Sequence, residues 1–397
     1  MRLVGFMYLK RQRTLILALI ILLSSMLFSL SALSLLGFYK GFTAYLGEEE
    51  SILAVYDRKS RTPFTGLVPA YLAEKIGALN GVLASSPEAI APCMVKGEST
   101  FLRGIVPEDF MRLNQVTIIQ GAMLELDDLN SAIVGKNVAE RLRLNINDKV
   151  LVLGVLSDRY LELQVKGIFV SHTPMDDEIL VPLYIGQWLR GTDYRHVTLI
   201  RFKIAKDAIT PSRIFEEIAK EASGPSPPSS PSTRPSQELQ PPSIASGIIA
   251  RFRIEDIGVE EAYSFMRSYM ERYGVTRESL LILSAMVFLF SGASIAVASK
   301  TIIAQHKGEI NVLRSVGASK RLLKLDMLAK LLPWSVAASS IGFAMAIAAL
   351  TIIQEGGYWQ VLSHTVPLSI DPIVIALNFI LVALLVSAVI LRSNLES

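Results

Sequence analysis

Four long stretches of this 397-residue chain contain no Asp, Glu, Lys, Arg or His, and they limit its fold more than any other feature. They run from 14 to 38, from 279 to 299, from 331 to 353 and from 372 to 391. Each is long enough to cross a hydrocarbon core as a helix, which takes about 20 residues. The composition agrees, because 51% of the residues are hydrophobic and only 19% are charged, below the usual share of about 25%. The sequence predicts an integral membrane protein.

The first stretch has an alternative interpretation as a secretory signal. The apolar region of such a signal normally has only about 7–15 residues and ends at a small-residue cleavage site. The stretch 14–38 is longer, and it follows the basic N-terminal segment 1–13. We therefore predict an uncleaved first span.

The uneven distribution of Lys and Arg predicts the orientation of the spans. Segment 300–330 carries seven of these residues, and the segment 354–371 carries none. Cytoplasmic loops are enriched in Lys and Arg. We therefore expect a multi-pass protein of the plasma membrane, with 1–13, 300–330 and the tail 392–397 in the cytoplasm. The region 39–278 and the short loop 354–371 are then outside the cell membrane.

The region 39–278 is predicted to be a large mixed α/β domain. Helix-like patterns occur at 69–79, 137–144, 183–190, 211–222 and 258–274. Alternating or β-branched runs, which are typical of strands, occur at 51–57, 149–156, 160–170, 196–204 and 247–254. The fold class is therefore four transmembrane α-helices, one before and three after an inserted extracytoplasmic α/β domain.

One segment of this domain has a composition that does not favour folding. Between residues 223 and 243, 14 of 21 residues are Pro or Ser, and such a segment cannot bury enough apolar surface to become ordered. It is either a surface tether, with Ser as sites for O-glycosylation, or a tolerated flexible insertion. We favour the insertion.

Sequence motifs of catalysis are missing. The chain has no G-x-x-x-x-G-K-[ST] loop for the phosphates of ATP, no H-E-x-x-H, no G-x-S-x-G and no C-x-x-C. Cys93 is the only cysteine, which excludes an intramolecular disulfide. We predict no catalytic residue, no bound cofactor, no metal site and no nucleic-acid partner, so the chain is not expected to be an enzyme.

The remaining polar candidates are interpreted as surface residues. The four histidines lie far apart in sequence: His172, His196, His306 and His364. The acidic run 176–178 is consistent with weak cation binding, but a solvated turn is the simpler interpretation. The charge-free spans argue against an ion-coupled carrier, which needs ionisable residues within the membrane. Small residues at Ala338, Gly342 and Ala346, four apart, predict close packing between helices, within or between chains.

The segment 305–330 is basic and amphipathic and lies between two spans. Ile310 and Leu313, together with Val316 or Val312, are expected on one side of a short helix. Gly317 stands where a helix ends in a left-handed residue, and Ser319 can cap a second helix that continues into the third span. Two interpretations remain: a docking site for a partner, or a basic helix on anionic lipid headgroups.

Residues of this segment resemble the cytoplasmic signature of FtsX/MacB-type ABC transporter permeases. The matching residues are Glu309, Ile310, Val312, Leu313, Arg314, Val316, Gly317, Ala318 and Ser319. The pattern of the core domain of that family is matched by Gly121, Ile133, Val134, Gly135, Ala139, Leu142, Leu144, Asp148, Lys149, Val150, Val165, Gly167, Ile168, Ile179, Val181 and Pro182. The order of one span, a large domain and three spans is also the layout of the family. Asn311 and Gly308 depart from its usual residues.

The resemblance implies a permease subunit that works as a dimer, with a second copy or a paralogue, and with a separate ABC ATPase. In the family, the segment matching 308–319 is a coupling helix seated on the ATPase. ATP hydrolysis then moves the spans and the extracytoplasmic domain, for export, extraction or mechanotransmission. Family members act on lipids, lipoproteins, peptides or cell-wall hydrolases, and membrane lipids surround the spans. The alternative is a membrane-anchored sensor or scaffold whose domain binds a partner without an ATPase.

Overall fold

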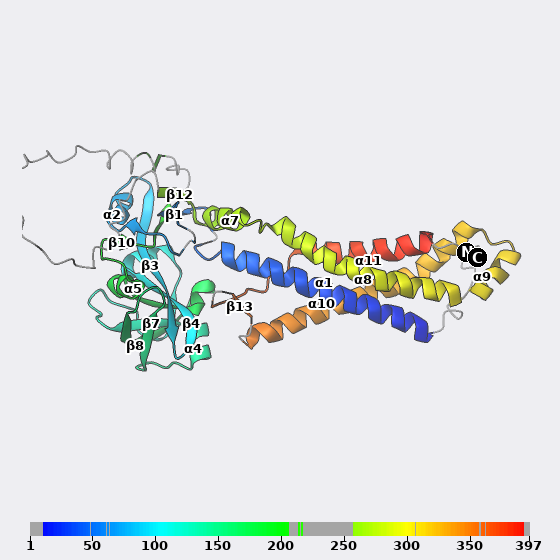
Figure 1. Ribbon diagram of the computed structural model, residues 1–397, viewed down its shortest axis with the longest axis horizontal. Coiled ribbons are helices and arrows are strands. Elements are labelled where there is room, and N and C mark those ends of the chain that lie inside the picture. Colours follow the sequence, from blue (N-terminus) through cyan, green and yellow to red (C-terminus); the bar gives the residue numbers. More distant parts are fainter. Residues whose placement is uncertain are drawn as a thin grey trace, which may run out of the picture. The chain divides into compact units, whose positions relative to one another are not determined.

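The computed structural model describes residues 11–47, 49–60, 62, 64–205, 213, 214, 216, 257–305, 307–356, 359–361 and 363–392. The chain divides into two compact units (Figure 1). One, which we call the helical unit, comprises Met1–Phe42, Glu271–Val361 and Thr365–Ser397. The other, the α/β unit, comprises Thr43–Met270 and Leu362–His364.

Long apolar helices make up most of the helical unit. Among the described residues, four helices are long and apolar enough to cross a membrane. They are α1 (Arg11–Thr43), α8 (Arg277–Gln305), α10 (Lys320–Glu355) and α11 (Pro372–Arg392), and the short helix α9 (Lys307–Ser315) lies between α8 and α10. A two-stranded hairpin, β13 (Gln360–Val361) with β14 (His364–Thr365), lies between α10 and α11. The predicted order of one span, a domain and three spans is confirmed.

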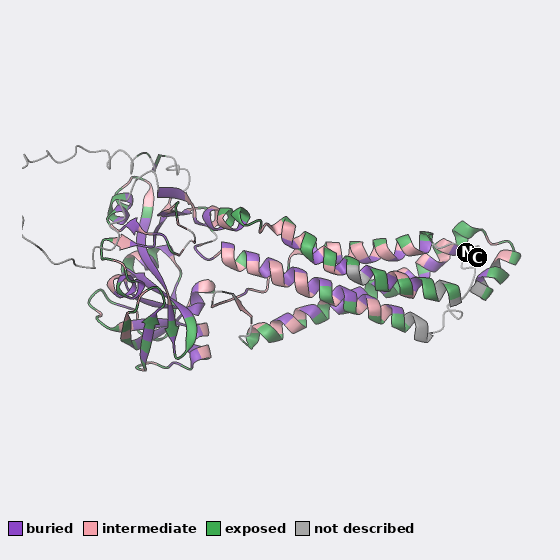
Figure 2. Ribbon diagram, in the orientation of Figure 1, coloured by how far each residue is buried: buried purple, intermediate pink, exposed green. Residues whose placement is uncertain are grey.

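Apolar side chains lie on both the inner and the outer faces of these helices. The inner faces form one cluster that includes Ile21, Phe28, Phe288, Leu331 and Val382. The outer faces expose many large apolar residues, and Figure 2 shows exposed (green) and intermediate (pink) positions along the ribbons of all four helices. A soluble protein rarely exposes so much contiguous apolar surface, so the outer faces are suited to lipid.

Two close contacts fix α1 against the later helices. A Cβ atom at Gly342 of α10 would lie 2.3 Å from the carbonyl oxygen of Leu22 in α1, so only glycine permits this approach. Phe28 of α1 packs edge-on against Phe288 of α8, with 5.7 Å between ring centroids. The small-residue pattern around Gly342 therefore serves packing within one chain.

A buried polar cluster joins three of the helices. The hydroxyl of Ser25 in α1 donates to Oδ1 of Asn378 in α11 at 2.9 Å. The amide nitrogen of Asn378 donates to the hydroxyl of Ser339 in α10 at 2.9 Å. All three side chains are buried, and none of them is charged, in agreement with the charge-free spans of the sequence. In a membrane such hydrogen bonds hold helices together, each contributing about 0.6 kcal/mol on average.

The α/β unit is built on a sheet of ten strands. Along the sheet the order is β12-β1-β11-β3-β4-β9-β6-β8-β5, and β7 pairs with both β3 and β8. The strands are β1 (Ile52–Asp57), β3 (Val82–Val95), β4 (Glu98–Ile105), β5 (Thr117–Gly121), β6 (Ser131–Gly135), β7 (Lys149–Gly154), β8 (Tyr160–Val170), β9 (Glu178–Pro182), β11 (Leu199–Ile204) and β12 (Ile257–Glu261). A separate pair joins β2 (Val68–Pro69) to β10 (His196–Val197).

Six of these strands close into a barrel. β3 pairs with β4, β4 with β9, β9 with β6, β6 with β8, β8 with β7, and β7 with β3 again. Its interior is filled by apolar side chains that include Cys93, Leu102, Val152, Leu163 and Ile179. The remaining helical elements are α2 (Leu72–Gly77), α3 (Pro107–Leu113), α4 (Lys136–Leu142), the 3-10 helix η2 (Pro174–Asp177), α5 (Leu183–Arg190) and α7 (Ala262–Arg272).

The structure confirms several predicted elements and corrects others. The predicted strand 160–170 and helix 183–190 coincide with β8 and α5. Residues 258–261 of the predicted helix 258–274 form a strand instead, because they pair with β1, and the helix begins at Ala262. The long strands β3 and β4 were not predicted. The Pro/Ser segment 223–243 and the predicted strand 247–254 lie outside the described residues, as does most of 211–222.

Candidate functional site

The segment between α8 and α10 folds into a short helix and a sharp turn. The turn that follows α9 contains Gly317 at a φ of +100°, a left-handed conformation that side chains resist and glycine adopts freely. Ser319 then caps α10, and its hydroxyl oxygen accepts a hydrogen bond from the backbone nitrogen of Leu322 at 3.3 Å. As predicted, the second helix continues without a break from Lys320 into the third span.

The two faces of α9 differ in their contacts. Ile310 is 4% exposed and belongs to the apolar cluster of the helical unit, together with Leu323 and Met327 of α10. Val312 is 64% exposed, and Val316, one helical turn further on, is 83% exposed. Ile310 therefore faces inward while both valines face outward, so the predicted common side for Ile310 and either valine is wrong.

The other residues predicted for this site differ in how far they are buried. Arg314 is half-buried, Ser319 is exposed, and Ala318 packs against the apolar cluster. The side chains of Glu309 and Leu313 lie outside those that the structure describes. The arrangement presents two exposed valines on a basic segment that is continuous with a 36-residue helix. Such a surface can be seated in an apolar groove of a partner protein.

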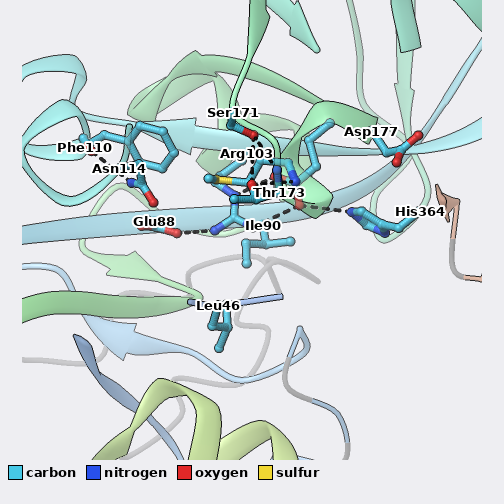
Figure 3. Close-up of polar contacts among 12 residues, drawn as sticks. Leu46, Glu88, Ile90, Arg103, Phe110, Asn114, Ser171, Thr173, Asp177 and His364 are labelled. Atoms are coloured by element: carbon cyan, nitrogen blue, oxygen red, sulfur yellow. Dashed lines mark hydrogen bonds and ion pairs between the residues drawn. The ribbon is translucent and has the colours of Figure 1, made fainter. Parts of the chain in front are cut away.

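A second group of polar residues lies buried in the α/β unit. Arg103 of β4 donates from Nε to Glu178 of β9 at 2.6 Å, and from Nη2 to the same carboxylate at 2.9 Å. It also bonds to Glu88 of β3, which in turn accepts from Nε of Arg201 in β11 at 2.7 Å. Figure 3 shows Arg103 with Glu88 on one side and His364 on the other. All four charged side chains are at most 1% exposed.

His364 of the β13–β14 hairpin completes this network. Its Nε2 lies 3.2 Å from Oε1 of Glu178, and its ring centroid is 4.9 Å from that of Tyr45. Burial alone would raise the pKa of Glu178, but the charge and hydrogen bonds of Arg103 outweigh it and hold that pKa well below its usual range. Glu178 is therefore an anion that ties together β4, β9 and the hairpin.

The predicted solvated turn at 176–178 is wrong. Asp176, Asp177 and Glu178 are all buried, and each has different partners: the backbone of Ser171 and His172 for Asp176, and Asn137 with Arg141 for Asp177. No group of three His, Cys, Asp or Glu residues with the geometry to hold a metal ion occurs among the described residues. His364 is likewise a residue of the network, with a side chain that is only 11% exposed, and not an isolated surface histidine. His306 lies outside the described residues.

Two family models match the chain. The model described as "MacB-like periplasmic core domain" matches residues 14–221, and the model described as "FtsX-like permease C-terminal" matches residues 281–395. The first match alone covers more than half of the chain. The chain belongs to the FtsX/MacB family of permeases. The resemblance noted in the sequence is thereby confirmed.

Solved structures with similarity to this permease include three domains. They are the periplasmic region of MacB from Actinobacillus actinomycetemcomitans (12% identity, TM-score 0.36, covering 55% of this chain and 92% of that one), the extracellular domain of the noncanonic ABC-type transporter YknZ from Gram-positive bacteria (14%, 0.31, 39% and 84%), and a domain of a putative permease from Porphyromonas gingivalis (13%, 0.30, 43% and 82%). Among curated proteins, none matches the sequence.

Membership of the family makes this chain the permease subunit of an ABC transporter. It is a membrane protein, and its family pairs with an ABC ATPase and dimerises.

The sequence predicted the turn at Gly317 and the cap at Ser319, since both depend on local residue types. It missed the network around Arg103, because its members come from four strands of the large sheet and from the hairpin between α10 and α11. The sequence shows these Arg and Glu residues, but it does not show which of them are paired.

Proposed function

We propose that this permease couples ATP hydrolysis by a separate ATPase subunit to movement of its α/β unit, for export, extraction or mechanotransmission. The observation that carries the proposal is the exposed pair formed by Val312 of α9 and Val316 of the turn that follows, which leads directly into α10. A force applied at this turn acts on one end of a continuous helix. The residues proposed to serve the contact are Glu309, Ile310, Val312, Leu313, Arg314, Val316, Gly317, Ala318 and Ser319.

The proposal divides these residues by role. Val312 and Val316 enter the groove of the ATPase, and Arg314 adds charge at its edge. Ile310 and Ala318 pack inward and transfer the load to α10, while Gly317 and Ser319 fix the angle between the two helices. Glu309 and Leu313 are assigned to the contact by the resemblance of their sequence pattern. In this scheme the turn faces the cytoplasm with both termini, the α/β unit is on the opposite side, and two permease copies or paralogues act together.

Co-purification tests the contact. The doubly substituted V312D/V316D permease should lose the ATPase that co-purifies with the parent protein, since buried carboxylates without partners are unfavourable. The matched control is Val155→Asp, because Val155 is also an exposed valine but lies in the α/β unit. The control should retain the ATPase. Equal recovery with all three proteins would contradict the proposed contact.

The activity of the complex distinguishes the proposal from a sensor or scaffold. Parent permease in lipid nanodiscs should stimulate ATP hydrolysis by the co-purified ATPase several-fold, and the double variant should not. A scaffold whose basic turn binds lipid would show no stimulation, and its affinity for vesicles would fall with salt and with decreasing anionic lipid.

A further inference from the structure

The connection between α10 and α11 is shared between the two compact units. Ser363 and His364 at the tip of its hairpin cluster with the α/β unit, while the residues on both sides of the tip cluster with the helices. Seven residues lie between His364 and the first residue of α11, Pro372, and the eight steps from one Cα atom to the other span at most about 28 Å in an extended chain. The covalent connection therefore limits how far the tip can move from the start of α11.

The base of this hairpin is fixed on α1. Val366 donates from its backbone nitrogen to the carbonyl oxygen of Trp359 at 3.1 Å, which closes the base. A Cβ atom at Gly37 would lie 2.7 Å from the carbonyl oxygen of Pro367, and one at Gly41 would lie 2.8 Å from Cδ of the same proline. These two glycines of α1 let the hairpin base pack directly against the helix backbone.

The tip makes directional contacts within the α/β unit. The hydroxyl of Ser363 lies 2.9 Å from that of Ser99 in β4. His364 reaches Glu178 at 3.2 Å, and its side chain is only 11% exposed. Because Arg103 grips the same carboxylate with two hydrogen bonds, the group that His364 contacts cannot move independently of β4.

The polar network crosses the α/β unit between two attachments to the helices. In order, it comprises His364, Glu178, Arg103, Glu88, Arg201 and the carbonyl oxygen of Leu46, which accepts from Nη1 of Arg201 at 2.8 Å. Leu46 follows the last residue of α1, Thr43, by only three positions. One end of the network is therefore three positions after α1 in the sequence, and the other end belongs to the segment of chain that connects α10 to α11.

We propose that His364 is a positioning residue that makes the α/β unit move together with the end of α10. The inference rests on the proposed coupling function and adds the place where movement leaves the spans. Movement that enters α10 at the turn around Gly317 passes along the helix to the hairpin, and through His364 and Glu178 to β4 and β9. An apolar tip would cover Tyr45 and Phe101 equally well, but it would not bond to a carboxylate anchored in two strands.

Distances between pairs of spin labels can test this proposal in the complete complex with its ATPase in nanodiscs. The labels are placed on cysteines at exposed positions: Tyr160 in β8, Ile352 in the last turns of α10, and Val297 in α8. Cys93 is replaced by alanine. In the parent, trapping with ATP should change the 160–297 distance and leave the 160–352 distance unchanged, since the α/β unit follows α10.

The informative variant is His364→Ala. We expect the ATP-dependent change in the 160–297 distance to fall by at least half, and the 160–352 distance to become ATP-dependent. His364→Gln, whose amide can still donate to Glu178, should restore the parent behaviour and guards against a simple folding defect. The matched control is His196→Ala, which removes another histidine–carboxylate contact of the same unit, the pair with Asp193 at 2.6 Å.

The outcomes separate the two proposals. If the parent shows no ATP-dependent distance change at all, the proposed coupling function fails and this inference fails with it. If the parent responds and H364A responds identically at both label pairs, the coupling function stands and the role of His364 is wrong.

A disulfide provides a second test. Cysteines at Ser99 and Ser363, whose hydroxyl oxygens are 2.9 Å apart, should cross-link readily in the absence and presence of ATP. Because the tip is proposed to stay attached throughout the cycle, oxidised protein should keep its stimulated ATPase activity within about twofold. A loss of more than tenfold that reduction reverses would show that the contact has to open, and would overturn the proposal.

Discussion

A single added methyl group is expected to be costly at Gly342. Its Cβ would lie 2.3 Å from the backbone oxygen of Leu22, which cannot move without shifting α1. We expect Gly342→Ala to lower the free energy of unfolding by about 1–3 kcal/mol, the usual range for overpacking. Unfolding of the purified protein in detergent, followed by circular dichroism, measures it.

Gly292 of α8 is the matched control for that change. A Cβ atom there meets only the flexible side chain of Leu385, at 3.1 Å. Gly292→Ala should therefore leave the free energy of unfolding within about 0.5 kcal/mol of the parent value, because only a flexible side chain has to shift slightly. Equal destabilisation by both alanines would contradict the close approach of α1 and α10.

The ionisation of Glu178 should make the stability of the α/β unit depend on pH. Its pKa is held below the usual range by Arg103, so the folded state favours the anion. The corresponding stability is present above the unfolded pKa of about 4.3 and is lost as pH falls toward the folded pKa. The protection factors of amides in β4 and β9, which correct for the intrinsic effect of pH on hydrogen exchange, should be unchanged between pH 7 and pH 5 and should fall below about pH 4.3. Protection factors at pH 3 equal to those at pH 7 would contradict the role of this ion pair.

At the residue scale, local geometry was predictable and distant pairing was not. Gly317 and Ser319 shape the backbone beside them, and Gly342 permits close packing because it is small. Residue type and spacing, which a single sequence shows, are enough to suggest these roles. Arg103 and Glu178 are 75 positions apart, and only the pairing of β4 with β9 brings them together. Asn378 was hidden for the same reason, since one amide in an apolar stretch has meaning only beside Ser25 and Ser339.

At the element scale, the turn between α9 and α10 predicts a contrast between two glycines. Gly317 has a φ of +100°, whereas Gly308 lies inside α9, and an added Cβ would meet no atom within 4 Å at either position. Gly317→Ala should therefore act through backbone strain alone, costing about 1 kcal/mol. We expect it to reduce stimulation of the ATPase several-fold.

The matched variant Gly308→Ala should behave differently in the same assay. Alanine is favoured over glycine inside a helix, so α9 becomes more stable and the exposed valines keep their places. Stimulation should remain within about twofold of the parent. If the two alanine variants gave the same activity, the angle at the turn would not matter for coupling.

Helices and strands were predictable where a pattern within their own residues distinguishes them. The spans stand out because they lack charge over 20 residues or more, and β8 shows the alternation of a strand with one buried face. β3 was missed because both of its faces are covered over eight consecutive residues, which removes the alternation. Residues 258–261 were assigned to a helix because their pairing partner, β1, lies about 200 positions earlier.

At the scale of the whole molecule, the proposed topology is testable with single cysteines. Cys93 is fully buried, and burial raises the pKa of its thiol to about 12, so it should not react with a maleimide in the folded protein. A cysteine at Ser315 of α9 should be labelled only after the membrane is permeabilised. One at Tyr160 of β8 should be labelled in intact cells. The reverse pattern would contradict the orientation predicted from Lys and Arg.

The overall architecture was predictable because hydropathy alone specifies spans and an inserted domain. The division into two units was not predictable at one point, the tip of the hairpin between α10 and α11. Hydropathy assigns residues 363 and 364 to a short loop, and only the positions of Ser99, Tyr45 and Glu178 show that these two residues belong to the α/β unit.

The contact between His364 and Glu178 also has a consequence for biosynthesis. The two residues are 186 positions apart, and α8, α9 and α10 are synthesised between them. Glu178 therefore cannot contact His364 until the ribosome has produced the third span. Maturation of the α/β unit is in this way linked to synthesis of the later spans, and a truncated chain that stops before His364 carries an incomplete polar network.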